Sequence, residues 1–475
     1  MQISLRTQDS FDVAIPAIVL GGGGCGLCAA LAIRDAGCEV LLLERDPKLW
    51  GTTSMSTGLI PAAGTSEQSE QAIDDSPRRF ADDIIRKTHG ETDQAMALHL
   101  AEQSADTVHW LRTVHDVQLS LITDFLYPGH SAMRMYGMPK RSGAELMAAL
   151  ESAAVSKGVH ILTNAHAKTL YHDGDRITGV GIQRPDGACE DYGCDALILA
   201  CCGFAGDQDM VRRYIPELEH ATFHGHPGNK GDALVWGEAL GVRLADMASY
   251  QGHGGLAVAH GIPILWPLIM EGGYQVNRLG ERFSDESRGY SEQAVKVLQQ
   301  PERVAWSVFD QQRYDLMMKF DDFQQAVGAG AIIKADTLER LAAMSGIDTG
   351  KLADTNARVD QMRSGTLADA HGRDFTGTAP LAAPFYCAKV TGALFHTQGG
   401  IVVDRDGRAI KLDGNPMPNL YAGGGAARGI SGPGCDGYMA GNGLLTATTL
   451  GKLAGRHAAR ALQMAAAETG EDQRQ

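Results

Sequence analysis

Short apolar runs separated by glycine dominate the start of the chain. Residues 17–20 are apolar, residues 21–24 are all glycine, and small or apolar side chains fill residues 27–33. A second apolar run, residues 40–43, ends at Glu44. Because short apolar runs bounded by glycine favour strands, this order predicts a strand, a glycine turn, a buried helix and a second strand.

The same region raises the question of a membrane span, because residues 13–33 carry no charge. That length could cross a bilayer. Pro16 and the four successive glycines are poor helix-interior residues, however. A signal peptide is also not favoured, since Arg6 is the only basic residue before the run. We therefore predict no transmembrane segment.

Further strand and helix patterns follow along the chain. Residues 174–183, 191–206 and 417–427 are predicted to contribute strands to the first sheet, the last two ending in turns. Helical spacing marks residues 70–116 and 143–158, and residues 290–375 have a mostly helical character, including the run PERVAWSVFDQQRYDLMMK.

Composition narrows the class of protein. A chain of 475 residues is expected to form two or three domains. A net charge of −15 argues against nucleic acid and anionic membrane surfaces as partners. Nine cysteines in this length do not indicate a disulfide scaffold, so a reducing cytoplasm fits best. We interpret Cys25 and Cys28 as small apolar residues at the strand–helix turn.

The glycine turn carries the first chemical signal. Gly21, Gly23 and Gly26 satisfy the G-x-G-x-x-G pattern, and Glu44 follows at the end of the next predicted strand. Such a turn lets the backbone approach a pyrophosphate at a helix N-terminus, while the acid can hydrogen-bond a ribose. FAD and NAD share this fingerprint. A glycine-ended strand near the C-terminus and the lack of a second such unit favour one long, extended cofactor.

Several motifs in order then resemble one family over nearly the whole chain. They are GTTSMSTGLIPAAGT, ALILACCGFAGDQDMVRRYIP, HPGNKGDALVWGEALG, NRLGERFSDES, HTQGGIVVD and NLYAGGGAARGISGPG. These resemble the fumarate reductase/succinate dehydrogenase flavoprotein superfamily, with a site pattern nearest to 3-ketosteroid dehydrogenase-like FAD enzymes. The resemblance implies an α/β fold, a Rossmann-like FAD-binding domain (1–248 and 396–475) with an inserted α+β capping domain (249–395).

The resemblance also implies FAD as cofactor and hydride transfer between a C–C bond and the flavin. Threonine, serine and methionine at 52–55 replace the histidine that tethers flavin covalently in membrane-bound members, so non-covalent FAD is expected. The implied cofactor-binding residues are Gly21, Gly23, Gly24, Cys25, Gly26, Glu44, Arg45, Thr52, Thr53, Ser54, Thr57, Gly58, Ala167, Ala200, Cys201, Gly203, Asp232, Gly424, Gly425, Asn442, Gly443, Leu444 and Leu445.

Four residues align with positions that act on the substrate in this superfamily. His253 and His396 match two histidines of the fumarate-reducing members. Tyr290 and Tyr438 fall near positions where the fumarate-reducing members have arginines. Ketosteroid dehydrogenases have tyrosines at similar positions. The resemblance implies that Tyr438 polarises a carbonyl and Tyr290 takes a proton.

A phenol is a weak base at neutral pH, so a neighbour is expected to lower the pKa of Tyr290. Arg288 and Tyr127 are the candidates. His224 and His226 raise the question of a metal, but a turn over FAD explains them, and no metal is expected.

These expectations describe an FAD-dependent dehydrogenase acting on CH–CH groups. It would introduce a C=C bond α,β to the carbonyl of a cyclic ketone or 3-ketosteroid-like substrate. Fumarate reductase-like reduction of an enoate remains an alternative, as does a flavin electron-carrier subunit. The expected partners are a small-molecule ketone or enoate and an unidentified electron acceptor.

Overall fold

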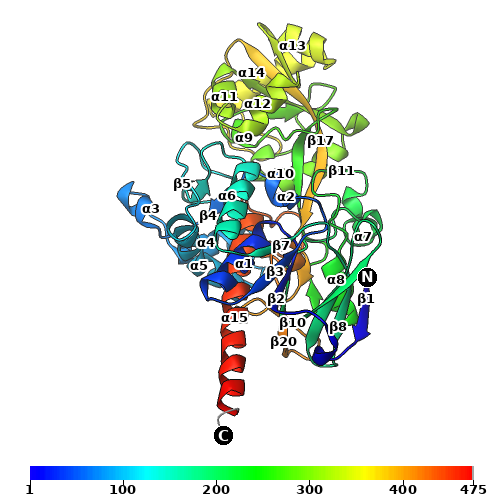
Figure 1. The fold of residues 1–475 in the computed structure, drawn as a ribbon. Coiled ribbons are helices and arrows are strands. Elements are labelled where there is room, and N and C mark those ends of the chain that lie inside the picture. Colours follow the sequence, from blue (N-terminus) through cyan, green and yellow to red (C-terminus); the bar gives the residue numbers. More distant parts are fainter. Residues whose placement is uncertain (473–475) are drawn as a thin grey trace.

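A nine-stranded mixed sheet organises the larger part of the molecule (Figure 1). The computed structural model describes residues 1–472. Parallel strands form the centre in the order β20, β10, β2, β3, β7, and antiparallel strands extend the sheet from the first half of β10. Its strands are β1 (Gln2–Leu5), β2 (Ala14–Leu20), β3 (Val40–Leu43), β7 (His160–Leu162), β8 (His166–His172), β9 (Ile177–Gln183), β10 (Cys189–Leu199), β19 (Arg408–Ile410) and β20 (Pro416–Ala422).

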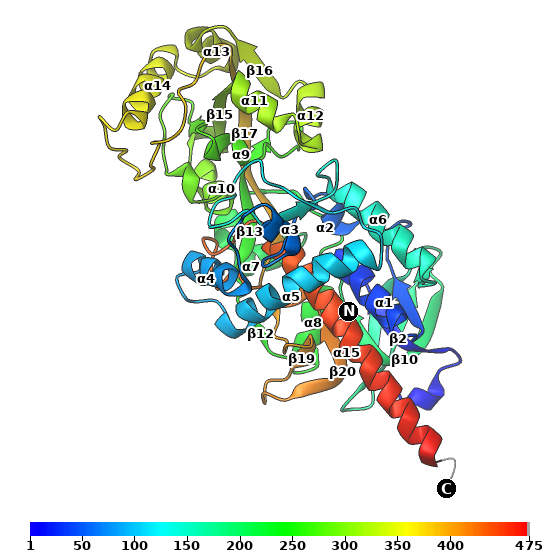
Figure 2. The same ribbon diagram turned by 90° about the vertical axis from the view of Figure 1, so that its left-hand side faces the viewer.

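Alternation along β2 buries both faces of this sheet. Ala17 and Val19 pack into one apolar cluster, which includes much of the first helix, while Ile18 and Leu20 pack into a cluster on the other side. Figure 2 shows the long C-terminal helix lying across α1 and α5. The helices of this part are α1 (Gly24–Asp35), α2 (Gly51–Ser54), α3 (Ser66–Glu70), α4 (Pro77–Lys87), α5 (Gln94–Thr113), α6 (Gly143–Ser156), α7 (Gln208–Tyr214), α8 (Asp232–Ala239) and α15 (Asn442–Asp472).

A second sheet of six strands forms the cap, at the top of Figure 1. Its long central strand, β17, pairs with four others along its length. The strands are β11 (Thr222–Phe223), β13 (Tyr250–Ala257), β14 (Tyr274–Val276), β15 (Val304–Asp310), β16 (Ile332–Ala335) and β17 (Phe385–Thr397). The helices are α9 (Pro267–Met270), α10 (Tyr290–Leu298), α11 (Gln311–Met317), α12 (Asp321–Gly328), α13 (Leu338–Ser345) and α14 (Thr349–Arg363).

One predicted helix is wrong. Residues 304–310 form strand β15, between β14 and β17, not part of a helix. All seven residues are buried, so no polar face was present to reveal the period of the element. A short, buried and mostly apolar run fits a strand as well as a helix, and pairing with β17 decides between them.

The other predicted strands and helices are confirmed: 174–183 contains β9, 191–206 the end of β10, 417–427 the end of β20, and 143–158 helix α6. The fold class is confirmed as well. The limits at 249 and 395 stay predictions, because β13 and β17 extend from the cap toward the first sheet.

Two small sheets complete the fold, made of β4 (Ile60–Pro61), β5 (Ser120–Leu121), β6 (Met135–Gly137), β12 (Leu244–Ala245) and β18 (Gly400–Ile401). Within residues 1–472, no helix combines the length and apolar character needed to cross a bilayer.

Candidate active site

Two connected cavities follow the carboxyl ends of the parallel strands. The first, the dinucleotide groove, runs along the glycine turn, and the second, the reaction chamber, lies between the first sheet and the cap. The reaction chamber and its mouth together contain about 1130 Å³ of empty space. The two share Thr52, Thr53, Cys202, Gly425 and Ala447 as lining residues. An elongated cofactor therefore fits along both.

The glycine turn is built for close approach of backbone. A Cβ added at Gly26 would lie 1.9 Å from the carbonyl oxygen of Gly21, so α1 packs directly on the turn. Gly21 has a φ of +107°, which other residues rarely adopt. Gly24 begins α1, and its N–H donates to Thr53 Oγ1 at 3.2 Å. The groove thus exposes a helix N-terminus, the site that favours a phosphate group.

Glu44 closes the other side of this groove at the end of β3. Its Oε2 accepts from the Gly22 N–H at 2.8 Å and its Oε1 from the Asp46 N–H at 3.0 Å. Each carboxylate oxygen keeps acceptor capacity for a ribose hydroxyl. Arg45, the next residue, lies 3.2 Å from Asp232 and also bonds the Gly228 carbonyl. The expected adenosine half of FAD fits these donors and acceptors.

Most of the predicted cofactor residues line the two cavities. Those lining the groove or the chamber are Gly21, Gly23, Gly24, Cys25, Glu44, Arg45, Thr52, Thr53, Thr57, Ala167, Ala200, Cys201, Asp232, Gly424, Gly425, Gly443 and Leu444. Those outside the lining are Gly26, Ser54, Gly58, Gly203, Asn442 and Leu445. Ser54 shows why: its hydroxyl donates to the Gly51 carbonyl at 3.0 Å, which is a local turn contact.

Sequence reasoning missed several lining residues. In the groove these are Leu20, Gly22, Leu43, Gly51, Ala165, His166, Cys202, His226, Asn229, Trp236 and Ala447. Some carried a signal: Asn229 lies in the HPGNKG motif, and its Nδ2 donates to Thr52 Oγ1 at 2.8 Å. His226, in the same motif, lies 2.6 Å from Asp46 Oδ2, so the turn is fixed by side-chain contacts.

Among residues 1–472, no cluster of three or more possible metal ligands occurs.

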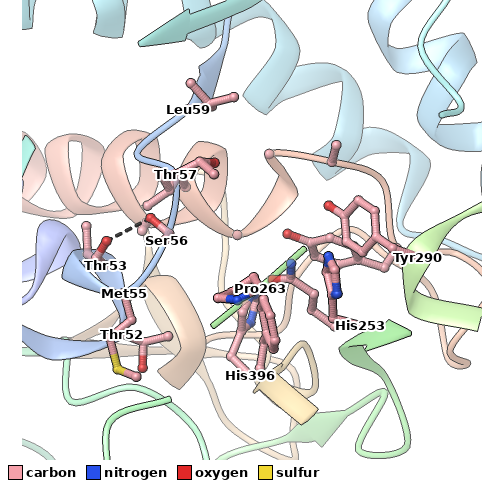
Figure 3. Close-up of a pocket in the computed structure, with 18 of the residues that line it drawn as sticks. Thr52, Thr53, Met55, Ser56, Thr57, Leu59, His253, Pro263, Tyr290 and His396 are labelled. Atoms are coloured by element: carbon pink, nitrogen blue, oxygen red, sulfur yellow. Dashed lines mark hydrogen bonds between the residues drawn. The ribbon is translucent and has the colours of Figure 1, made fainter. Parts of the chain in front are cut away.

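Five of the six predicted catalytic residues meet in the reaction chamber: Tyr127, His253, Tyr290, His396 and Tyr438. Figure 3 shows His253, Tyr290 and His396 gathered in one part of the pocket. The sixth, Arg288, is exposed and lies outside the chamber lining. Residues from distant parts of the chain are thus brought together by the closure of cap on sheet.

The two central tyrosines lie against each other. The rings of Tyr290 and Tyr438 are 6.0 Å apart between centroids, at 61°. Burial raises the pKa of Tyr290 well above its usual range, and Tyr438, Tyr127 and Glu292 add to this. Burial also raises the pKa of Tyr438, while hydrogen bonds from Gly443 N–H and from Tyr290 oppose the shift. The expectation that a neighbour depresses the pKa of Tyr290 is wrong, because no cation reaches it.

The two histidines are neutral, His253 being buried and His396 partly buried. His253 Nδ1 accepts from the Gly255 N–H at 3.0 Å, so its proton is on Nε2, and its ring stacks on Phe395. Burial lowers its pKa to about 3, and that of His396 to about 4. A Cβ at Gly443 would lie 2.7 Å from His396 Nε2 and 3.5 Å from the Tyr438 hydroxyl. Glycine at this first turn of α15 therefore lets both groups approach the helix N-terminus.

The remaining lining is mostly apolar. The residues that sequence reasoning missed here include Leu59, Met135, Gln251, Pro263, Leu265, Trp266, Asp322, Phe395 and Gln398. Within the described residues, Asp322 is the one charged side chain in the lining, and no arginine or lysine is present in it. Polar side-chain contacts to a ligand thus come from phenol, imidazole, amide and serine or threonine hydroxyl groups and from one carboxyl.

Comparison with known proteins was consistent with this geometry. Residues 17–444 match the family described as FAD binding domain. A fumarate reductase (cytochrome) from Shewanella frigidimarina is 28% identical over 95% of this chain and 78% of its own. An open-conformation flavocytochrome c3 fumarate reductase aligns with a TM-score of 0.79 at 26% identity, covering 96% and 79% of the two chains.

A second solved structure shares the fold at lower identity. This is a 3-ketosteroid dehydrogenase from Rhodococcus jostii, with a TM-score of 0.73 and 22% identity over 96% of this chain and 99% of the other. That enzyme was solved in complex with a steroid dione, 4-androstene-3,17-dione.

Proposed function

Because the chain belongs to the FAD binding domain family and is an FAD-dependent oxidoreductase acting on carbon–carbon double bonds, we propose that it desaturates cyclic ketones. The product would carry the new C=C bond α,β to the carbonyl, in a 3-ketosteroid-like or smaller ring. Non-covalent FAD, when bound, supplies the acceptor for the hydride that leaves the β-carbon. The single observation that carries the proposal is the facing pair Tyr290 and Tyr438 in a chamber without basic side chains.

Tyr438 is proposed to polarise the substrate carbonyl. It keeps its proton at neutral pH, so it can donate a hydrogen bond to oxygen as negative charge develops there. The Gly443 N–H and the neutral His396 lie beside it, at the N-terminus of α15. That helix end favours negative charge.

Tyr290 is proposed to take the α-proton. Its phenolate form accepts the proton from carbon and becomes the neutral phenol beside Tyr438 and Tyr127, and that proton leaves to solvent before the next turnover. The neutral His253 ring, 5.1 Å from the Tyr290 ring, orients the phenol without adding a charge. Arg288, exposed, has no part in this step.

Reduction of an activated alkene is the second candidate. The retained histidines His253 and His396 favour it, since both donate or accept hydrogen bonds in the chamber. A dicarboxylate such as fumarate is disfavoured in either direction, because two desolvated carboxylates would find no cation in the lining. An enone or a neutral enoate ester would meet no such penalty.

Anaerobic titration of the FAD-loaded protein tests the proposal. Cyclic ketones, 3-ketosteroids, keto acids and enoates are added in turn while the absorbance bands of oxidised flavin are followed. Bleaching by a ring ketone is the expected result. Bleaching by none of the ketones, with reoxidation of photoreduced protein by fumarate, would overturn it. Bleaching only by a partner protein would favour an electron carrier.

A further inference from the structure

The lining of the reaction chamber contains one acidic side chain, and the proposed chemistry does not use it. Asp322 lies in the first turn of α12, in the cap, and lines the chamber with Tyr127 and Leu265. Its neighbours in the lining are largely aromatic or aliphatic. A carboxyl placed in such surroundings is costly unless a partner donates to it.

No such partner comes from the protein. Among residues 1–472 the Asp322 carboxyl makes no hydrogen bond or ion pair, whereas the adjacent Asp321 accepts from Gln325 Nε2 at 3.0 Å. Burial, with the charge of Asp321, raises the pKa of Asp322 to about 7. A hydrogen-bond donor on a ligand would therefore stabilise the Asp322 carboxylate.

The nearby basic side chains pair with another carboxylate, although Nη1 of Arg141 has no hydrogen-bond partner among the described residues. Arg141 forms an ion pair with Asp124 and lies over the Phe320 ring, at 5.2 Å from its centroid. Lys319, one residue before Phe320, lies 3.3 Å from the same Asp124. Both cations are thus drawn to Asp124, and Asp322 is left facing the cavity.

Within the chamber lining, Asp322 interacts directly with Tyr127. Burial raises the pKa of Tyr127, Arg141 opposes this, and Asp322 adds to it. Tyr127 in turn interacts with Tyr290, and Tyr290 with Tyr438. The polar groups thus follow one another from Tyr438 to Asp322, so a ligand whose carbonyl meets Tyr438 extends toward Asp322.

We propose that Asp322 selects substrates by accepting a hydrogen bond from a hydroxyl or amino group at the end remote from the reacting carbonyl. The substrate class is then a ring ketone that carries a donor at its far end. A carboxylate at that end is rejected, because it would face another carboxyl without a cation between them. The inference rests on the proposed function only for the position of the carbonyl.

Binding of phenols, as mimics of the enol, tests this without turnover. Dissociation constants are measured from the absorbance of oxidised flavin with para-ethylphenol, tyrosol, tyramine and para-hydroxyphenylacetate. We expect tyramine and tyrosol to bind about tenfold more tightly than para-ethylphenol, as one charge-assisted hydrogen bond allows, and para-hydroxyphenylacetate to bind most weakly.

Three variants assign the preference to Asp322. Asp322→Leu should bring all preferences to within about twofold, while Asp322→Asn, which keeps an acceptor, should lose the preference for tyramine more than that for tyrosol. Asp321→Asn is the matched control and should keep the wild-type order. A tyramine preference that survives in Asp322→Leu would overturn the inference, as would equal binding of all four ligands by the wild type.

The two proposals fail separately. If no ketone bleaches the flavin but Asp322→Leu still removes the tyramine preference, the desaturase proposal fails and the role of Asp322 stands. If ketones bleach the flavin and Asp322→Leu leaves the phenol preferences unchanged, the desaturase proposal stands and the role of Asp322 fails.

Discussion

At the scale of single residues, the phenol pair decides the chemistry. Tyr290→Phe and Tyr438→Phe each remove one hydroxyl from a packed pair and leave the ring contacts in place. We expect each variant to slow flavin reduction by substrate at least about tenfold, or ~1.4 kcal/mol of activation free energy, with FAD content unchanged. Stopped-flow absorbance measures the rate.

Tyr274→Phe is the matched control for these variants. Tyr274 is also fully buried, and its hydroxyl donates to Asn356 Oδ1 at 3.1 Å, but it lies outside the chamber. Its loss should lower stability slightly and leave the rate of flavin reduction unchanged. A loss below about tenfold in either chamber variant would remove that tyrosine from the mechanism.

The pKa of Tyr290 predicts a particular pH dependence. Its base form must be deprotonated, and burial together with Tyr438 raises its pKa well above the usual value of a phenol. The rise in rate with pH is therefore shifted to higher pH. Flavin reduction should still increase at pH 9–10 rather than level off near neutrality. A pre-steady-state pH series checks this. A plateau from pH 7 to 9 would show that substrate binding lowers the pKa or that another group is the base.

The residues of the site were predictable from the sequence where they belong to a motif. Tyr290, Tyr438, His253 and His396 belong to motifs, and the structure brings all four into one chamber. Arg288 was included because it lies two residues from Tyr290, but the turn before α10 directs it to solvent. Asp322 was not predictable, since its position at the chamber depends on how the cap docks, which no local pattern encodes.

At the scale of elements, contact between α1 and α15 holds the cofactor site together. A Cβ at Gly451 would lie 2.4 Å from the carbonyl oxygen of Cys25, and a Cβ at Gly455 would lie 2.3 Å from that of Ala29. The two helices thus touch backbone to backbone. Since α1 begins at the glycine turn and α15 begins at the chamber, this contact sets the distance between the two ends of the cofactor site.

Gly451→Ala should separate these helices. The added methyl meets backbone, which cannot rotate away, so we expect a loss of roughly 1–3 kcal/mol in the free energy of unfolding and weaker FAD binding. Thermal unfolding and FAD titration of apoprotein measure the two effects. Gly328→Ala, in α12, is the control, because nothing lies within 4 Å of its added Cβ. Equal behaviour of the two variants would show that α15 adjusts freely.

Buried elements were predictable where glycine turns marked their ends, whereas the buried strand β15 was not. The alternation of strand, glycine turn, helix and strand over residues 17–44 is strong because each piece ends in glycine or charge. Strand β15 is mostly apolar and buried along its whole length. Its partner β17, which includes Lys389, lies far along the chain. Such long-range pairing overrides the local pattern.

At the scale of the whole molecule, one ion pair joins the first sheet's helices to the cap. Lys87, the last residue of α4, bonds Glu292 of α10 and donates to the Arg288 carbonyl at 2.9 Å. The two side chains are 12% and 14% exposed. Because α10 begins at Tyr290, this contact holds the start of that helix against the body of the protein.

Lys87→Met should loosen the cap and disturb Tyr290. The substitution leaves the largely buried Glu292 carboxylate without its cation. Its Oε2 already lacks a hydrogen-bond partner within the described chain. We expect a loss of roughly 2–3 kcal/mol in the free energy of unfolding, below the ~3–5 kcal/mol of a fully buried pair because some water reaches both ends. Flavin reduction should slow while FAD affinity, set mainly by the distant groove, changes little. Lys87→Met/Glu292→Gln is the matched double variant, and denaturant titration should show it recovering part of the loss, since the uncompensated charge is gone. Strictly additive losses would mean that the two side chains act independently and that this ion pair does not hold the cap.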